Sequence, residues 1–361
     1  MAENLDIAAT DVVSTPKRPR SDYIDILTVL ATFCVVWLHS SQYEYTYAHT
    51  WGWKESVFVE CIAYWAVPVF FMNSGVNLFN YRDRYSTRHY VGQRIRKAVI
   101  PFLAWLVIAY IVEIVLKKMP VNWSLLSPHQ LYNVFITQEP MPTYWFFLPL
   151  FAIYAAMPVL SLLREYRAIL WYMVIAGALT YSILPMIMAI WGVDWNTALE
   201  FPLTGGGYLI FPILGYLFST QEVPKRIRIL IYITGSLACA IRFIVTVHLS
   251  DQTGSLDTLL YNYLYLPGSL LACAVFLFVQ HCDWQRILRF RFLRFSVTSI
   301  TSASLGIYLI HYYFIRDVWP RIGWTLDRTI TRTVGVVAAF LGALLIISLL
   351  RKIPGVRRIV P

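Results

Sequence analysis

The first residues of this chain whose types and spacing could do chemistry are Asp25, Thr28, Thr32 and His39. They interrupt an otherwise apolar run, at offsets of 0, 3, 7 and 14 residues. At roughly 100° per residue these offsets fall on one face of a helix. Polar groups in a membrane helix usually face the bundle interior or a wet cavity, because hydrocarbon solvates them poorly. His39 is therefore predicted as the chemical centre, with Asp25 and Thr28 as further candidate catalytic residues.

A second histidine ends a second polar pattern near the end of the chain. Ser304, Tyr308 and His311 lie at i, i+4 and i+7, again on one helix face. A single buried histidine is usually a hydrogen-bonded structural residue, but two histidines on two polar faces favour a functional site. An imidazole titrates near neutral pH and can act as a general acid or base. Neither histidine has metal-ligand spacing, so the sequence predicts no metal site.

Further polar groups lie inside other apolar segments. Asn73 and Ser74 share one segment, where they either bond neighbouring helices or line a site. Arg242 is the only basic residue deep inside a segment, and its permanent charge needs a carboxylate partner or a bound anion. A structural ion pair and a ligand contact both remain open for it. The candidate carboxylates are Asp25, Glu60 and Glu113.

Arg94, Arg96 and Lys97 form a basic cluster one turn before an apolar segment. Cations beside a helix end can bind phosphate groups, with Arg as a planar fork and Lys as a point charge. Membrane topology also places cations here, because cytoplasmic loops carry an excess of Lys and Arg. If only the charge is considered, topology is the stronger explanation. The cluster is a candidate phosphate site beside that alternative.

The composition indicates which elements must position these residues. Hydrophobic residues make up 58% of the chain and charged residues 14%, against about 25% charged in soluble domains. An apolar segment of about 20 residues can cross a bilayer as a helix. The sequence predicts an all-α polytopic membrane protein with a tail over 1–20, a transmembrane domain over 21–351 and a short basic tail over 352–361. The ten predicted segments are 22–41, 56–80, 98–116, 142–160, 168–191, 207–219, 229–249, 258–280, 300–315 and 333–350.

The net charge of +10 follows the predicted topology. With the N-terminus inside, the inner segments carry 22 of the 30 Lys and Arg residues and the outer loops carry 7. By the positive-inside rule both ends are predicted to be cytoplasmic. The basic excess is therefore explained without a nucleic-acid partner. The five cysteines show no paired spacing, so no disulfide framework is expected.

Five short motifs, in order along about residues 22–350, carry a resemblance to a known family. They are Tyr23-Ile24-Asp25 with His39, Pro68 to Met72 with Ser74-Gly75, Arg94 to Lys97 before Pro101, Tyr144-Trp145-Phe146 before Pro158, and Ser304 to His311. Each motif alone is weak, and together they are fairly specific. The chain resembles the membrane-bound acyltransferase family 3, and within it the short single-domain type of the enterobacterial-antigen O-acetyltransferase.

The resemblance implies a function and a set of partners. It implies transfer of an acyl group, by expectation acetyl, from cytoplasmic acyl-CoA to a hydroxyl of a cell-surface or lipid-linked glycan, in a bacterial plasma membrane. Acyl-CoA is then a co-substrate, and no bound cofactor is expected. His39 would be the general base, Arg94, Arg96 and Lys97 would hold the CoA phosphates, and Asn73, Tyr308 or His311 would face the developing oxyanion. The oligomeric state, a homo-oligomer included, is left open.

One position departs from the family pattern, which is an Arg, ten residues and then the His. Eleven positions before His39 stands Thr28. Arg242 could fill the space, the substrate could differ, or catalysis could be lost. The family's Arg-x-x-Arg pair likewise appears as Arg94 with Lys97. Two other classes therefore stay open: a non-catalytic relative that binds acyl-CoA or a glycan, and a glycan or lipid transporter, although no repeated halves are visible.

Overall fold

The computed structural model describes residues 21–116 and 128–360, and within these ranges all regular structure is helical. The predicted tail over 1–20 lies outside the described residues. The α-helices are α1 Asp22–Ser40, α2 Trp51–Ala63, α3 Ala66–Leu78, α4 Thr87–Arg94, α5 Ile100–Val115, α6 Pro128–Thr137, α7 Phe147–Leu160, α8 Arg167–Gly177, α9 Leu184–Ile190, α10 Ile210–Thr220, α11 Lys225–Thr253, α12 Leu266–Gln280, α13 Gln285–Leu288, α14 Arg291–Tyr313, α15 Thr329–Arg332 and α16 Val334–Leu350.

Short π and 3-10 turns join several of these helices end to end. Among the described residues, seven continuous helical segments are long and apolar enough to cross a membrane: Asp22–Tyr45, Trp51–Asp83, Thr87–Val115, Pro142–Leu160, Arg167–Ile190, Lys225–Thr253 and Arg291–Ile322. The other three predicted segments appear as the shorter apolar helices α10, α12 and α16. The protein is a multi-pass helical membrane protein, and seven of the ten predicted spans reach full crossing length.

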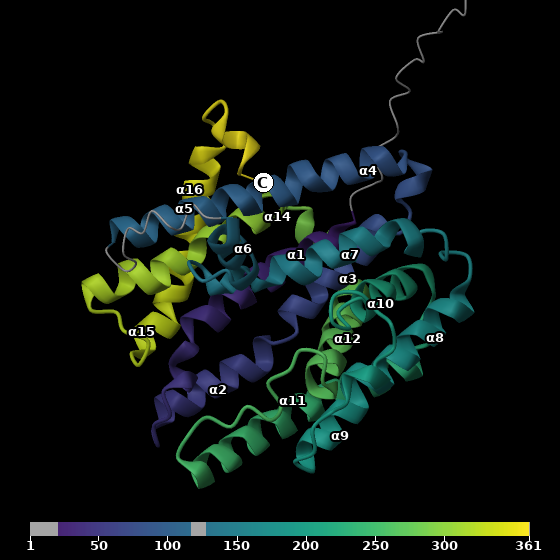
Figure 1. Cartoon of the computed structure of the whole chain (residues 1–361), viewed down its shortest axis with the longest axis horizontal. Coiled ribbons are helices and arrows are strands. Elements are labelled where there is room, and N and C mark those ends of the chain that lie inside the picture. Colours follow the sequence, from purple (N-terminus) through teal and green to yellow (C-terminus); the bar gives the residue numbers. More distant parts are fainter. Residues whose placement is uncertain (1–20, 117–127, 361) are drawn as a thin grey trace, which may run out of the picture.

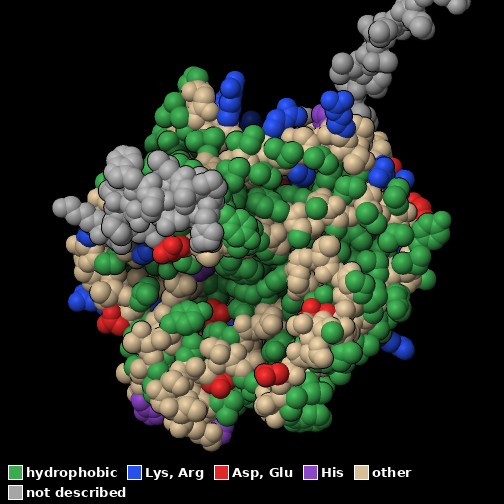
Figure 2. Space-filling view, viewed as in Figure 1, with side chains coloured by type: hydrophobic (Ala, Val, Ile, Leu, Met, Phe, Trp, Pro, Cys, Tyr) green, Lys and Arg blue, Asp and Glu red, His purple; other side chains and the backbone are tan. Residues whose placement is uncertain are grey.

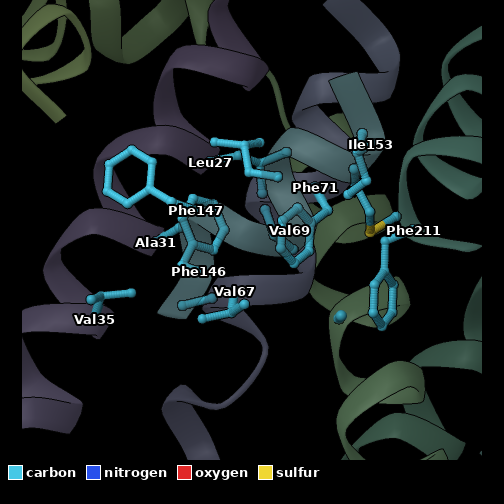
Figure 3. Packing of buried hydrophobic residues seen from close by; sticks show 14 of the residues in the cluster. Leu27, Ala31, Val35, Val67, Val69, Phe71, Phe146, Phe147, Ile153 and Phe211 are labelled. Carbon is cyan, nitrogen blue, oxygen red and sulfur yellow. The ribbon is translucent and has the colours of Figure 1, made fainter. Parts of the chain in front are cut away.

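Helix α1 lies at the centre of the bundle (Figure 1), where it packs against α2, α3, α12, α14, α15 and α16. In the apolar 18-residue stretch that includes α1, 61% is buried inside the protein, whereas only 17% of the corresponding stretch of α11 is buried. The polar face of α1 therefore looks into protein, as predicted. Figure 3 shows apolar side chains of α1 packing with those of the neighbouring segments: Leu27, Ala31, Val35, Val67, Val69, Phe71, Phe146 and Phe147.

The second membrane segment is interrupted between α2 and α3. The helix breaks at Tyr64 and Trp65, three residues before Pro68, which cannot donate a backbone hydrogen bond. Beyond the break, α3 crosses α10 at very short range. A Cβ built on Gly75 would lie 1.9 Å from the Pro212 carbonyl oxygen, and one on Gly215 would lie 2.2 Å from that of Met72. Only glycine allows so close an approach of the two helix backbones.

Both described ends of the chain lie at one end of the bundle. Arg294 Nη1 lies 3.5 Å from Asp22 Oδ1, and Arg351 donates to the backbone oxygen of Ser302 on the same helix α14. Figure 2 shows Lys and Arg side chains along the upper edge, where α4 and the end of α16 lie, above a mainly hydrophobic surface. This distribution agrees with the basic clusters of the predicted inner loops. Which side of a membrane that end faces stays a prediction.

Candidate active site

His39 and His311 meet at the outer end of α1, that is, the end opposite Asp22. His39 Nδ1 lies 2.7 Å from His311 Nε2, and the two rings are stacked with centroids 5.0 Å apart. His39 is half-buried, whereas His311 is fully buried. The two polar faces predicted separately for α1 and α14 therefore converge on one pair of imidazoles, 272 residues apart in sequence.

The hydrogen-bond partners of His311 determine which ring nitrogens of the two histidines carry a hydrogen. His311 Nδ1 lies 2.8 Å from the carbonyl oxygen of Tyr308 and 3.1 Å from that of Ile307. Because a carbonyl oxygen only accepts, Nδ1 of His311 carries the hydrogen and its Nε2 is the acceptor in the neutral ring. His39 then donates from Nδ1 to His311, which leaves Nε2 of His39 without a hydrogen. An unprotonated imidazole nitrogen with a fixed orientation is the arrangement that general-base chemistry needs.

His39 opens onto a large cavity at this end of the bundle, which we call the outer cavity. Its volume is about 710 Å³, and polar and aromatic side chains line it. The residues around it are Leu38, His39, Gln42, Glu44, Tyr45, Glu60, Tyr64, Pro142, Thr143, Trp145, Tyr208, Thr258, Tyr261, Asn262, Tyr263 and Tyr312. A concave site with aromatic walls and a few buried polar groups is typical of small-molecule or sugar binding.

A second, smaller cavity lies deeper between α1, α3, α7 and α14, and we call it the inner cavity. Its volume is about 150 Å³ and its lining is mostly apolar, with Ser74, Tyr154, Ser304 and Tyr308 as its polar members. The Tyr308 ring is 5.9 Å from that of His311. The inner cavity thus approaches the histidine pair through Tyr308, and it uses the polar face that the sequence predicts for α14.

The basic cluster divides between the interior and the surface. The Arg94 guanidinium stacks over the Tyr154 ring, 5.4 Å from its centroid, and its Nε is buried without a hydrogen-bond partner among the described residues. Arg96 and Lys97 are exposed, on the π-helical turn Ile95–Val99 that follows α4. Since Tyr154 lines the inner cavity, Arg94 is the member of the cluster that connects with it.

Arg242 pairs with Glu60, one of the three carboxylates that the sequence leaves open. Its Nη2 lies 3.5 Å from Glu60 Oε1, and its guanidinium is stacked 3.7 Å from the Tyr64 ring centroid and 4.7 Å from that of Tyr261. Burial raises the pKa of Tyr261, whose hydroxyl therefore stays protonated beside this pair. Glu113 instead pairs with Arg316. Arg242 is thus a structural ion pair in the wall behind the outer cavity.

Asp25 and Thr28 lie away from the histidine pair. Neither lines the outer or the inner cavity, and at 1.5 Å per residue Thr28 is about 16 Å from His39 along the helix. The Asn73 amide donates to the Thr28 hydroxyl at 3.3 Å. Arg242, engaged by Glu60, does not take the space that the family's Arg would fill. Thr28 is instead part of a neutral polar contact between α1 and α3.

Three predicted hydrogen-bond donors are engaged within the protein. Tyr308 donates its hydroxyl to the Thr143 carbonyl, His311 donates to backbone carbonyls, and Asn73 donates to Thr28. By contrast, the buried hydroxyl of Thr143 has no partner among the described residues and lines the outer cavity.

Sequence reasoning missed most polar residues of the outer cavity, among them Glu44, Thr143 and Tyr261. The carboxylate oxygens of Glu44 and the Tyr261 hydroxyl are also buried without a hydrogen-bond partner in the described part of the chain. Glu44 lies five residues after His39, between two tyrosines. Its closeness to His39 in the sequence could have identified Glu44 as a site residue. Thr143 and Tyr261 are far from His39 in the sequence, and only the fold brings them to the outer cavity.

Comparison with known proteins identifies the family. The family model described as an acyltransferase domain matches residues 21–352, nearly the whole chain. No curated protein and no solved structure matches the chain. The match covers every element that forms the two cavities and the histidine pair. The chain belongs to the membrane-bound acyltransferase family 3.

Proposed function

We propose that this protein transfers an acyl group, acetyl in the simplest case, from acyl-CoA to a hydroxyl of a cell-surface or lipid-linked glycan. The observation that carries the proposal is the His39–His311 pair, in which His39 lines the outer cavity and His311 lies beside Tyr308 of the inner cavity. An acceptor in the outer cavity can reach His39, and a thioester from the inner cavity can approach by way of Tyr308. The predicted orientation makes the donor side cytoplasmic, in a bacterial plasma membrane.

The chemistry follows from the unprotonated Nε2 of His39. This nitrogen removes the proton of the acceptor hydroxyl while the oxygen attacks the thioester carbonyl carbon. The tetrahedral intermediate carries an oxyanion, to which the free hydroxyl of Thr143 can donate a hydrogen bond. Collapse of the intermediate breaks the carbon–sulfur bond, and the CoA thiolate takes the proton from the His39 imidazolium. His311 stabilises that imidazolium and holds its ring in place.

Arg94, Arg96 and Lys97 supply the proposed contacts to CoA phosphates. The buried Nε of Arg94, which has no hydrogen-bond partner among the residues that the structure describes, supports a direct contact, whereas Arg96 and Lys97 would add a general positive field. The pantetheine arm would then pass Tyr154 into the inner cavity. The volume of about 150 Å³ suits a short acyl chain better than a long one.

A non-catalytic relative is the second candidate, and Thr28 in place of the family's Arg favours it. Incubation of the purified protein with radiolabelled acetyl-CoA separates the candidates. The enzyme releases or transfers label, a non-catalytic relative binds acetyl-CoA without turnover, and a glycan transporter does not bind it. Retention of intact, bound acetyl-CoA in the presence of glycan acceptors would refute the enzymatic proposal.

A further inference from the structure

The outer cavity contains a buried acidic side chain that has no ion-pair or hydrogen-bond partner among the described residues. Glu44 is only 1% exposed, and neither of its carboxylate oxygens has a hydrogen-bond partner there. It nevertheless lines the outer cavity, on the turn that directly follows α1. A buried carboxylate without a partner is costly unless it is protonated or a ligand supplies the partner.

The neighbouring charges leave Glu44 as the unmatched group. Arg242 is paired with Glu60, with Nη2 3.5 Å from Oε1, and Arg332 is paired with Glu55, with Nη2 2.9 Å from Oε2. Burial and the neighbouring Glu60 disfavour a negative charge on Glu44, and the two guanidiniums favour it. Each guanidinium is thus paired with another acid, and neither forms an ion pair with Glu44 in the part of the chain that the structure describes.

The rest of the cavity wall suits a sugar ring. Tyr263 stacks on Tyr64 with ring centroids 3.8 Å apart, and Trp145 stacks on Tyr263 with centroids 5.5 Å apart. Aromatic side chains that line a cavity can pack against the apolar face of a sugar. The buried hydroxyl of Tyr261 has no hydrogen-bond partner within the described ranges and can bond a polar group of such a ligand.

We propose that Glu44 binds a protonated amino group of the acceptor, so that the glycan recognised by the outer cavity is an amino sugar with a free amine. Its ammonium group would supply the missing positive charge and up to three hydrogen-bond donors. A neutral or N-acetylated sugar would fit the aromatic wall but leave the carboxylate unmatched. This inference rests on the proposed function for the role of the ligand as acceptor, but not for its binding.

Binding without an acyl donor tests the inference separately from catalysis. Calorimetry on the purified full-length protein in detergent would compare glucosamine oligomers with N-acetylglucosamine oligomers of equal length. The wild-type protein should bind the glucosamine oligomers about tenfold or more tightly, the advantage expected for a hydrogen bond to a charged group. Equal binding of both oligomers, or no binding of the glucosamine oligomers, would overturn the proposal.

Glu44→Gln assigns the preference to one residue, because the amide keeps the shape and removes the charge. This variant should lose the preference for the free amine, while its affinity for the N-acetylated oligomers changes little. Asp194→Asn, at an exposed acidic position outside both cavities, is the matched control and should retain the preference. A Glu44→Gln protein that still prefers the free amine would contradict the assignment. An amine preference in a protein that transfers no acyl group would instead refute only the proposed function.

Discussion

At the scale of single residues, the reactivity of His39 depends on a partner that fixes its ring. The hydrogen bond from His39 Nδ1 to His311, 2.7 Å long, leaves Nε2 free to take a proton, and His311 is itself held by the Tyr308 carbonyl. His311 is therefore a positioning residue that acts through His39. Its loss should affect the chemical step and leave the binding of acyl-CoA intact.

We expect His311→Ala to lower kcat by about 10²–10⁴-fold, the range for a general base that loses its orientation. The KM for acyl-CoA should stay close to that of the wild type, because His311 lies away from the proposed phosphate contacts. Steady-state kinetics with radiolabelled acetyl-CoA measure both constants. His248→Ala, at an exposed histidine, is the matched control. A His311→Ala protein with unchanged kcat would show that His39 needs no partner.

Thr143 carries a second prediction at this scale, because its buried hydroxyl has no partner in the described residues. Thr143→Val keeps the shape and removes the donor, and we expect kcat to fall by about 10²-fold or more, as for a lost oxyanion donor. Thr143→Ser keeps a hydroxyl and should recover most of the activity. If Thr143→Val and Thr143→Ser behave alike, the hydroxyl does not stabilise the oxyanion.

At the scale of elements, the site depends on how closely α3 and α10 cross. The backbones touch at Gly75 and Gly215, where a Cβ would overlap a carbonyl oxygen. The α2–α3 segment also brings Glu60, Tyr64 and Ser74 to the two cavities. The crossing therefore supports the walls of both sites from one side.

Gly215→Val should separate α3 from α10 and destabilise the protein by about 1–3 kcal/mol or more, since a packed interior resists added volume. A lower thermal unfolding temperature in detergent would report it. Gly92→Ala is the control, because no atom lies within 4 Å of the added methyl group and alanine favours a helix. Equal unfolding temperatures for Gly215→Val and the wild type would contradict the close crossing.

The sequence predicts these elements better than it predicts their partners. The spacing of Asp25, Thr28, Thr32 and His39 correctly places a polar face toward protein, because helical periodicity is a local property. The contact between His39 and His311 joins positions 272 residues apart, and no local pattern encodes it. The sequence likewise could not identify Glu60 as the partner of Arg242, because Asp25, Glu60 and Glu113 are all acidic and no local pattern distinguishes them. Glu44 was missed because its isolation appears only once the neighbouring charges are paired.

At the scale of the whole molecule, the two cavities approach the histidine pair from different directions. The outer cavity opens beside His39, and the inner cavity approaches through Tyr308 and reaches Arg94 through Tyr154. Such an arrangement would let donor and acceptor enter separately and meet only at the base. The proposal thus requires that a change at the donor end weaken acyl-CoA binding without altering the acceptor site.

Arg94→Gln should weaken the binding of CoA by about 10-fold or more, because a charge-assisted contact in a partly buried position is lost. Arg96→Gln and Lys97→Gln should each have a smaller effect, since both side chains are exposed and screened by solvent. Isothermal calorimetry with CoA measures all three. Unchanged affinity in the protein with all three substitutions would leave membrane topology as the explanation of the cluster.

The central claim, that His39 is the base of an acyl transfer, is tested most directly by His39→Gln in the purified protein. Glutamine keeps a polar side chain but cannot take the proton of the acceptor hydroxyl. With radiolabelled acetyl-CoA and a glucosamine oligomer, we predict that transfer falls by about 10²–10⁴-fold, while acetyl-CoA still binds and the unfolding temperature is retained. Transfer by His39→Gln at a rate near that of the wild type would contradict the account.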